Sequence, residues 1–354
     1  KSRKKVAFAM LAICFAFVSP ADARVYRVNG SAVASGDGGS WSAPLDEAGF
    51  AAALSGAVSG DEFWIAKGVY RPAVPASADG VTSEEQGKSF TLGDGVALYG
   101  GFVGSETARE QRDPDKHCVV LTGDLGLDDG RDARGVTLSA DVIRGTNSKS
   151  VLKGTNVKGV RLDGVAVSGG EGGLGGGLNL SESDVVIENC LFQGNKGTNG
   201  AAINISIPPQ GSGTASLYIR DSRFLENRGT GSWGGAINSA QTEVKLFRSR
   251  FEGNAVGSGQ SGNGGGISFQ SNRKPGAAVL TIESCSFLNN YAGGGGGAVY
   301  AGRTPDSITI RRSLFKDNKT SHNGGALRLL QATNILVEDC LFTGNSTVIE
   351  GGAM

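Results

Sequence analysis

Residues 280–299 read LTIESCSFLNNYAGGGGGAV and contain two motifs that recur through the second half of the chain. The first motif is Phe-x-x-Asn, represented here by Phe287 and Asn290. The second is a glycine pair followed by Ala and a larger apolar residue, and it begins here at Gly296. Because the two motifs recur in step, they indicate a repeat architecture with one structural unit per repeat.

Six copies of the Phe-x-x-Asn motif follow one another at intervals of roughly 30 residues, a spacing typical of solenoids. They are Phe192/Asn195, Phe224/Asn227, Phe251/Asn254, Phe287/Asn290, Phe315/Asn318 and Phe342/Asn345. A glycine-rich strand start follows each copy, at Gly200, Gly234, Gly264, Gly296, Gly324 and Gly351.

Alternating apolar residues before each Phe predict a short strand. In the stretch quoted above, Leu280 and Ile282 face inward, but the next buried position, Cys285, lies three residues further on. A strand cannot change parity in this way without bending, so we expect a corner between them. A further strand follows each glycine pair, with side chains such as Ile267 and Phe269 facing inward.

Three short strands and three corners per repeat predict one coil of a parallel β-solenoid, in which equivalent residues stack about 4.8 Å apart. Stacked Phe rings would then form an aromatic ladder. We expect each Asn to occupy the left-handed region at a corner, with its amide bonded to the Asn above. The glycine pairs supply positive φ at another corner, where a Cβ would clash.

The composition excludes other fold classes. Glycine accounts for 58 of the 354 residues, which argues against an ordinary helical protein, and the chain lacks the proline content of collagen. Hydrophobic residues make up 39% and charged residues 19%, so the chain has enough apolar surface to fold. We therefore expect an all-β, single-stranded parallel β-helix.

Residues 1–23 have the pattern of a secretory signal peptide. Basic residues at the start precede an uncharged run from Val6 to Val18, and Ala21-Asp22-Ala23 forms a small-x-small cleavage site. The uncharged run is too short to span a bilayer, so we expect an exported chain with no transmembrane helix after cleavage. Cleavage leaves a slightly acidic chain, which argues against a nucleic-acid partner.

Residues 24–164 are predicted to form an N-terminal cap and irregular β-helix coils, and residues 165–354 the regular repeats. The segment Leu45–Val58, with Phe50 and Leu54 on one face together with Val58, predicts a short helix that covers the first coil. Irregular coils are expected at 89–102, 119–123 and 151–167. Because the chain ends at Met354 inside a glycine motif, we expect it to be truncated at the C-terminus.

The Phe-x-x-Asn and Gly-Gly-Ala-Ile motifs resemble the repeats of the chlamydial polymorphic outer-membrane proteins. The earlier segments 60–72 and 96–102 are similar to bacterial secreted right-handed parallel β-helix repeat proteins. This resemblance implies a right-handed parallel β-helix at the outer-membrane surface or outside the cell, with adhesion as the better-known role. The polymorphic family also carries a C-terminal β-barrel, which this sequence does not match.

The chain keeps four cysteines after the predicted cleavage, at Cys118, Cys190, Cys285 and Cys340. An even number in an exported protein usually suggests disulfides. The last three, however, occupy the same repeat position in coils that are two or three apart, which exceeds the distance a disulfide spans. We therefore predict free thiols that fill the core in place of Ser.

A cluster of four aspartates, Asp124, Asp128, Asp129 and Asp132, lies in a glycine-rich stretch between coils. Carboxylate oxygens on a loop are suitable calcium ligands, but their spacing does not match an EF-hand. We favour a solvated loop, with no cofactor, and keep calcium as the alternative.

Catalysis in a β-helix would require acidic and basic groups gathered on one groove. The nearest such pair is Asp221 and Arg248, at equivalent corners of neighbouring coils. Because the charge signs alternate along this corner, we interpret the pair as part of a ladder of salt bridges on a solvated edge.

Two aromatic residues, Trp233 and Tyr291, lie between the Asn and the glycine pair of their repeats. Their rings are candidates for stacking on sugars, although covering the edge of a coil is the simpler role.

We predict a monomeric, adhesin-like scaffold that binds a carbohydrate or protein partner through corner loops. The loops of most variable length are Ser206–Thr214, Ala255–Asn263 and Asn272–Ala277. One alternative is a polysaccharide lyase or glycoside hydrolase of the pectate-lyase-like type. A second alternative is a structural spacer for a C-terminal domain.

Overall fold

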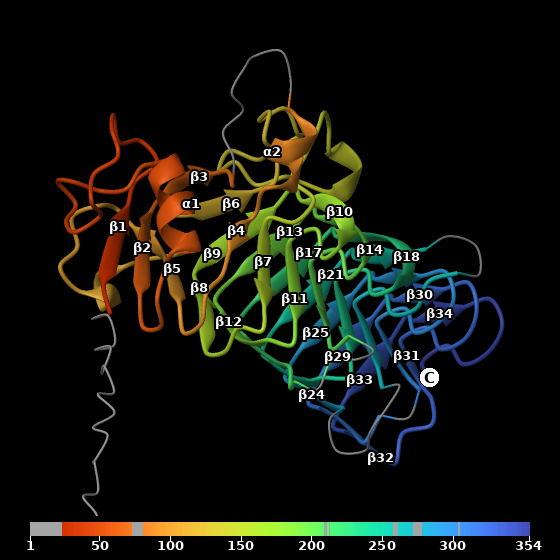
Figure 1. Cartoon of the computed structure of the whole chain (residues 1–354). Coiled ribbons are helices and arrows are strands. Elements are labelled where there is room, and N and C mark those ends of the chain that lie inside the picture. The colour runs from red at the N-terminus through yellow and green to blue at the C-terminus, as the bar shows by residue number, and fades with distance from the viewer. Residues whose placement is uncertain are drawn as a thin grey trace, which may run out of the picture.

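The structure is a computed structural model that describes residues 23–72, 81–208, 211, 213–257, 261–271, 278–303 and 305–354. The predicted signal peptide lies outside these residues except for Ala23, as do parts of two predicted binding loops and all of Asn272–Ala277. Figure 1 shows coils stacked along one axis from the N-terminal end to the C-terminal end. The fold is the predicted right-handed parallel β-helix with a short helix near its first coils.

The described residues form four parallel sheets, which we number in the order in which one coil visits them. Sheet 1 runs in the order β1 (Val25–Val28), β2 (Glu62–Ala66), β5 (Ala97–Phe102), β8 (Val160–Asp163), β12 (Asp184–Glu188), β16 (Ser216–Arg220), β20 (Glu243–Phe247), β24 (Val279–Glu283), β28 (Ser307–Arg311), β32 (Asn334–Glu338). Sheet 2 runs in the order β3 (Gly68–Tyr70), β6 (Val119–Thr122), β9 (Val165–Ser168), β13 (Leu191–Gln193), β17 (Arg223–Leu225), β21 (Arg250–Glu252), β25 (Ser286–Leu288), β29 (Leu314–Lys316), β33 (Leu341–Thr343).

Sheet 3 runs in the order β10 (Glu171–Leu174), β14 (Lys196–Asn199), β18 (Arg228–Trp233), β22 (Ala255–Val256), β26 (Tyr291–Ala292), β30 (Lys319–Thr320), β34 (Ser346–Thr347). Sheet 4 runs in the order β4 (Phe90–Thr91), β7 (Leu152–Thr155), β11 (Leu178–Ser181), β15 (Ile203–Ser206), β19 (Ile237–Ala240), β23 (Ile267–Gln270), β27 (Val299–Gly302), β31 (Leu327–Leu329). The helical segments are α1 (Glu47–Ser55), α2 (Ser83–Gly87) and the 3-10 turns Arg109–Gln111 and Ala140–Val142.

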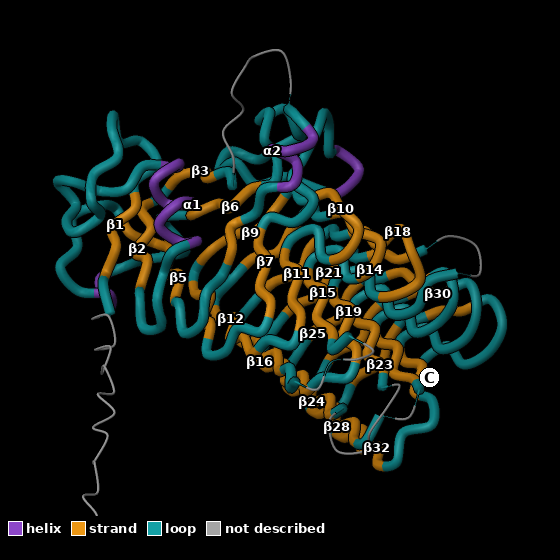
Figure 2. The backbone as a smooth tube through the Cα atoms, in the orientation of Figure 1, coloured by secondary structure: helices purple, strands orange, loops and turns teal. Residues whose placement is uncertain are grey.

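A regular coil has four strands, so the prediction of three was wrong. One coil consists of β12, β13, β14 and β15, and the same order repeats in the coils that follow (Figure 2). The additional strand belongs to sheet 3 and comes directly after the Asn. It contains only two residues in β22, and so short a strand shows no period-two pattern in the sequence.

The phenylalanines of the repeat form the predicted aromatic ladder. Neighbouring rings from Phe192 to Phe342 are stacked with centroids 4.6 to 5.2 Å apart and planes within 8° of parallel. The rings of the coils between Phe192 and Phe315 are completely buried. The ladder confirms that the six repeats are wound in register about a common axis.

The asparagines form a second ladder inside the corner between sheets 2 and 3. Asn254, for example, donates from Nδ2 to Oδ1 of Asn290 at 3.0 Å and to the carbonyl of Phe224 at 2.8 Å. The amide contact is as predicted, but the backbone conformation is not. The left-handed residue is the one before each Asn, such as Asn289 with φ of 54°. That residue turns the chain, which leaves the Asn free to point inward.

The other two predicted turning points adopt positive φ. At the corner between sheets 1 and 2, the residue that directly follows the sheet 1 strand is left-handed, as at Asp221 and Arg248. At the glycine pairs the first glycine is left-handed. A Cβ on Gly234 would lie 2.2 Å from the carbonyl oxygen of Ile237, so only glycine fits there.

The predicted capping helix is present but shorter than expected. α1 begins after the N-cap Asp46, whose carboxylate accepts from the Gly49 N–H at 2.7 Å, and it ends at Ser55. Its buried Phe50 packs against the ring of Phe90 at 5.0 Å. Val58 lies beyond the helix and is 39% exposed, so it does not share the buried face as predicted.

Burial decreases at the C-terminal end of the described coils. Ile335 of β32 is 48% exposed, whereas Ile308, its register partner in β28, is completely buried. The difference arises because β32 is the outermost strand of sheet 1 and no described coil lies over it. Stacking of neighbouring coils is therefore what buries these side chains.

Candidate functional site

A groove crosses the outer face of sheet 2 in the coils of β9, β13, β17 and β21. In the three-residue strands β13, β17 and β21 the middle residue points into the core, such as Phe192 or Phe224, and its two neighbours point outward. The residue before the Phe is therefore presented on the outer face. These outward residues are in register, with Leu191 opposite Arg223 and Arg223 opposite Arg250.

One wall of the groove is the segment 112–118, which leaves the irregular N-terminal coils. Arg112 anchors it by an ion pair with Asp163 at 2.7 Å and a hydrogen bond to the carbonyl of Gly100 at 3.0 Å. Pro114 lies against Gly164, where a Cβ would come within 2.7 Å of the proline ring. The absence of a side chain at this glycine lets the wall approach the corner closely.

The opposite wall is the segment 131–142, which follows β6. Asp132 shapes its tip by accepting the Arg134 N–H at 2.8 Å and the Arg134 Nε–H at 2.8 Å. Gln193 of β13 holds the rest of the segment by donating to the carbonyl of Leu138 at 2.9 Å. The first wall is thus fixed to β8 within the irregular coils, and the second wall to β13 of the regular coils.

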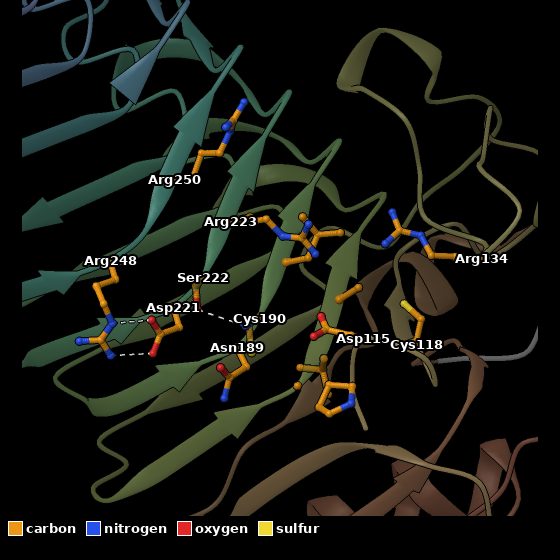
Figure 3. Close-up of a pocket in the computed structure, with 15 residues that line it drawn as sticks. Asp115, Cys118, Arg134, Asn189, Cys190, Asp221, Ser222, Arg223, Arg248 and Arg250 are labelled. Carbon is orange, nitrogen blue, oxygen red and sulfur yellow. Dashed lines mark hydrogen bonds and ion pairs between the residues drawn. The ribbon is translucent and has the colours of Figure 1, made fainter. Parts of the chain in front are cut away.

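The groove contains a cavity of about 430 Å³. Its floor is apolar and buried, and it includes Val165, Ala166 and Leu191. Its rim carries the charged side chains Asp115, Arg134, Asp221, Arg223, Arg248 and Arg250. Figure 3 shows the guanidinium groups of Arg223 and Arg134 pointing toward one another from opposite sides, with Asp115 below them.

The charged residues of the rim differ in whether they have partners. Arg250 pairs with Glu252 at 2.6 Å, and Arg134 pairs with Asp132 at 2.7 Å. Among the described residues, the side chains of Arg223 and Asp115 take part in no hydrogen bond or ion pair. These two side chains are therefore free to meet a ligand.

The predicted pair of Asp221 and Arg248 lies at one end of this groove. It is a two-bonded ion pair, with Nε to Oδ1 at 2.7 Å and Nη2 to Oδ2 at 2.8 Å. The hydrogen bond from Arg248 lowers the pKa of the Asp221 carboxyl, and the same bond raises the pKa of Arg248. A carboxylate held ionised and an arginine held protonated are poorly suited to acid and base catalysis.

The corner between sheets 1 and 2 carries the ladder of ion pairs that the sequence suggested. Arg220 bridges to Glu188 of the coil before it at 2.7 Å, and Arg311 bridges to Glu338 of the coil after it at 3.0 Å. Arg161 also pairs with Glu188. The alternating charges along this corner are thus largely satisfied by one another.

Trp233 and Tyr291 are not brought together. Trp233 packs on Tyr300 with centroids 5.7 Å apart and has the Arg303 guanidinium over its ring at 5.3 Å. The hydroxyl of Tyr291 is hydrogen-bonded to Ser321 at 2.8 Å. Both rings thus have partners in neighbouring coils, and stacking of a sugar on them stays a prediction.

Three of the four predicted aspartates lie together, with carboxylate oxygens of Asp124, Asp128 and Asp129 within 4.8 Å of one another. Asp132 is instead paired with Arg134. Asp124 accepts the backbone N–H groups of Asp128 and Asp129 at 3.0 and 3.1 Å. Calcium binding here stays a prediction, and isothermal titration of the purified chain with calcium tests it.

Asp129 is enclosed by donors that organise the second wall. Its carboxylate accepts the Arg144 N–H at 2.7 Å, the Thr137 hydroxyl at 3.0 Å and the Asn147 amide at 3.1 Å. Burial nevertheless raises the pKa of Asp129 to about 6, and the charge of Asp124 adds to this rise. Asp129 thus connects the start of the second wall to Arg144 and Asn147, which follow its end.

The four described cysteines are unbridged. Cys190 and Cys285 are buried, and burial raises the pKa of each thiol to about 12. The Cys190 N–H donates to the Ser222 hydroxyl of the next coil at 3.1 Å, which shows that Cys and Ser exchange at one core position. Cys118 is half-buried and lies beside the groove.

Sequence reasoning missed the groove. One signal was available, because the outward residue before the Phe is Arg in two successive repeats, at Arg223 and Arg250. No comparable signal marks Pro114, Asp115 or Arg134, since the walls come from coils without a regular repeat.

A family model for the Chlamydia polymorphic membrane protein repeat matches residues 284–302. The match covers three of the four strands of one coil, β25 to β27, and includes the Phe287 and Asn290 motif and the glycine pair at Gly296. No curated protein matches the chain significantly. Within the described ranges, no helix has the length and apolar character needed to cross a membrane.

Proposed function

We propose that the chain is an adhesin-like scaffold at the outer-membrane surface or outside the cell, which binds a carbohydrate or protein partner in the groove over sheet 2. The observation that carries this proposal is the pairing of a rigid floor with two anchored walls and unpartnered charged side chains at Arg223 and Asp115. Binding sites are commonly built in this way, with loops held by a fixed scaffold.

The surface location is supported by the repeat match and by the resemblance of residues 1–23 to a signal peptide. The matched repeat belongs to a family that is described as membrane proteins. A β-helix of this kind is a stiff rod, because its side-chain ladders fix each coil on the next. Such a rod can present a groove away from the surface that carries it.

The groove favours binding over cleavage of a bound polymer. Its one close acid and base pair, Asp221 and Arg248, is occupied internally by two short hydrogen bonds. The remaining carboxylate, Asp115, is exposed and has no basic partner among the described residues. A hydrolase would need two carboxyl groups arranged across the scissile bond.

The test is to incubate the purified chain with a panel of acidic and neutral polysaccharides and of immobilised surface proteins. We expect retention of at least one partner without new reducing ends or absorbance from unsaturated products. Products that disappear in Asp221→Asn would establish a lyase or hydrolase and overturn the proposal. Failure to bind any member of the panel would favour a structural spacer.

A further inference from the structure

The guanidinium of Arg223 has the properties of an anion-binding group. Its backbone is fixed, because the Arg223 N–H donates to the carbonyl of Cys190 at 2.8 Å and the next side chain, Phe224, is locked in the aromatic ladder. The side chain itself is exposed and has no partner among the residues described. A positioned but unpaired arginine presents its planar donors to a carboxylate or sulfate.

Arg134 approaches the same space from the opposite wall. Its Nε–H is held by Asp132, which orients the guanidinium across the groove toward Arg223 (Figure 3). Two guanidinium groups that face each other repel unless an anion lies between them. The position between Arg223 and Arg134 is therefore where we expect a negative group of the ligand.

Asp115 restricts which anionic ligand fits. Its carboxylate lies below the two arginines on the other wall and accepts no hydrogen bond within the described part of the chain. An acidic peptide such as poly-glutamate would be repelled there, because its side chains carry carboxylates and no hydroxyl donors. A sugar presents hydroxyl donors beside its acidic group, and a carboxylate accepts them.

The floor of the cavity leaves recognition to the rim. Ala166 and Leu191 line the bottom, but they are only 3% and 4% exposed and belong to one apolar cluster with Val120 and Val136. A ligand in the cavity therefore meets the charged side chains of the rim.

We infer that the groove binds an acidic oligosaccharide, with a carboxylate or sulfate between Arg223 and Arg134 and hydroxyls on Asp115. This inference rests on the proposed binding function and specifies its ligand. Carboxylated and sulfated sugars share the chemistry that the two arginines recognise, so the experiment below separates these two sources.

The test measures affinity of the intact chain for four probes: an oligogalacturonate, a heparin-derived oligosaccharide, a neutral glucan oligomer and a poly-glutamate peptide. We expect one or both acidic sugars to bind, with affinity that falls as salt increases, and little binding of the other two probes. Arg223→Gln is expected to weaken acidic-sugar binding by about tenfold or more. Asp115→Ala should weaken the same binding.

Arg24→Gln is the matched control, because Arg24 is exposed, its side chain has no partner among the described residues and it does not line the cavity. It should bind like the unmodified chain. An unchanged melting temperature shows that Arg223→Gln folds normally, since the replaced group has no internal partner.

The outcomes separate the two proposals. Equal binding of neutral and acidic sugars, or acidic-sugar binding unaffected by Arg223→Gln, overturns the ligand but leaves the binding function. Poly-glutamate binding as tight as that of the sugars overturns the choice of a carbohydrate. Binding that is followed by cleavage overturns the proposed function while the recognition of an acidic sugar stands.

Discussion

The irregular coils of residues 24–164 and the regular coils of residues 165–354 share parallel sheets. They differ in what they contribute to the groove. The regular coils place identical side chains over one another, as in the Phe and Asn ladders. The irregular coils break this repetition with the longer segments 112–118 and 131–142, which form the groove walls. Repetition thus supplies the rigid floor, and departures from repetition supply the walls of the site.

The largest effect is expected in the middle of the regular coils. Phe287→Ala removes a completely buried ring with stacked neighbours on both sides, so it should lower the free energy of unfolding by about 3 to 5 kcal/mol. Chemical denaturation measures this loss. Val33→Ala, at a fully exposed position of the irregular region, should change little, and comparable effects at the two sites would contradict the contrast.

A smaller but clear effect is expected within the irregular region, where the first groove wall is fixed to β8. Arg112→Ala breaks the ion pair with Asp163, in which the two side chains are only 14% and 10% exposed. The substitution should lower the free energy of unfolding by about 3 kcal/mol. It should also weaken ligand binding by releasing the wall.

Arg248→Ala is the matched control for this attachment, since it breaks an ion pair on the exposed corner of the regular coils. Its melting temperature should stay close to that of the unmodified chain. A larger loss for Arg248→Ala than for Arg112→Ala, measured by thermal unfolding, would show that the wall is not anchored as described.

The second wall should make stability depend on pH. The folded-state pKa of Asp129 is raised from 3.8 to about 6, so the folded chain binds a proton more tightly than the unfolded chain does. This contribution is complete below pH 3.8 and is lost as pH rises through about 6.

The measurement compares melting temperatures of the unmodified chain and Asp129→Asn from pH 4 to pH 7. The advantage of the unmodified chain over the variant should shrink as pH increases across this range. An advantage that grows with pH would mean that the carboxylate is stabilised as an anion, as a bound cation would require.

The smallest effect concerns the reactivity of the thiols in the two regions. Cys190 and Cys285 of the regular coils are buried and have strongly raised pKa values, so they should resist alkylation in the folded chain. Cys118 of the irregular region and Cys340 of the last described coil are only partly buried, so both should react sooner. Mass spectrometry of the labelled chain locates the modified residue, and a bridge between Cys190 and Cys285 would refute the register of the coils.

The sequence predicts the regular coils well, because each repeated residue stacks on the equivalent residue of the next coil. The positions of Phe287, Asn290 and Gly296 in one repeat therefore indicate their contacts in the next. Two details could not be predicted from the sequence. A two-residue strand such as β22 has no periodicity, and the left-handed residue before each Asn varies in type, from Gly253 to Asn289.

The groove could not be predicted in the same way. Its walls depend on contacts such as Arg112 with Asp163 and Gln193 with Leu138, which join segments of different coils without any repeated pattern. The pairing of Asp221 with Arg248 was expected, because both occupy equivalent corners. The convergence of Arg134 on Arg223 was not, since nothing in the sequence indicates where the tip of an irregular loop lies.

The asparagine ladder also bears on how the length of the rod can change. Asn290 makes the same two contacts with Asn318 that Asn254 makes with Asn290, so each coil offers its successor an identical docking surface. Excising the 28 residues that separate Asn290 from Asn318 would rejoin matching surfaces and leave a shorter rod of the same cross-section. The length of the rod can therefore change by whole coils, without a change in the part of the molecule that binds a ligand.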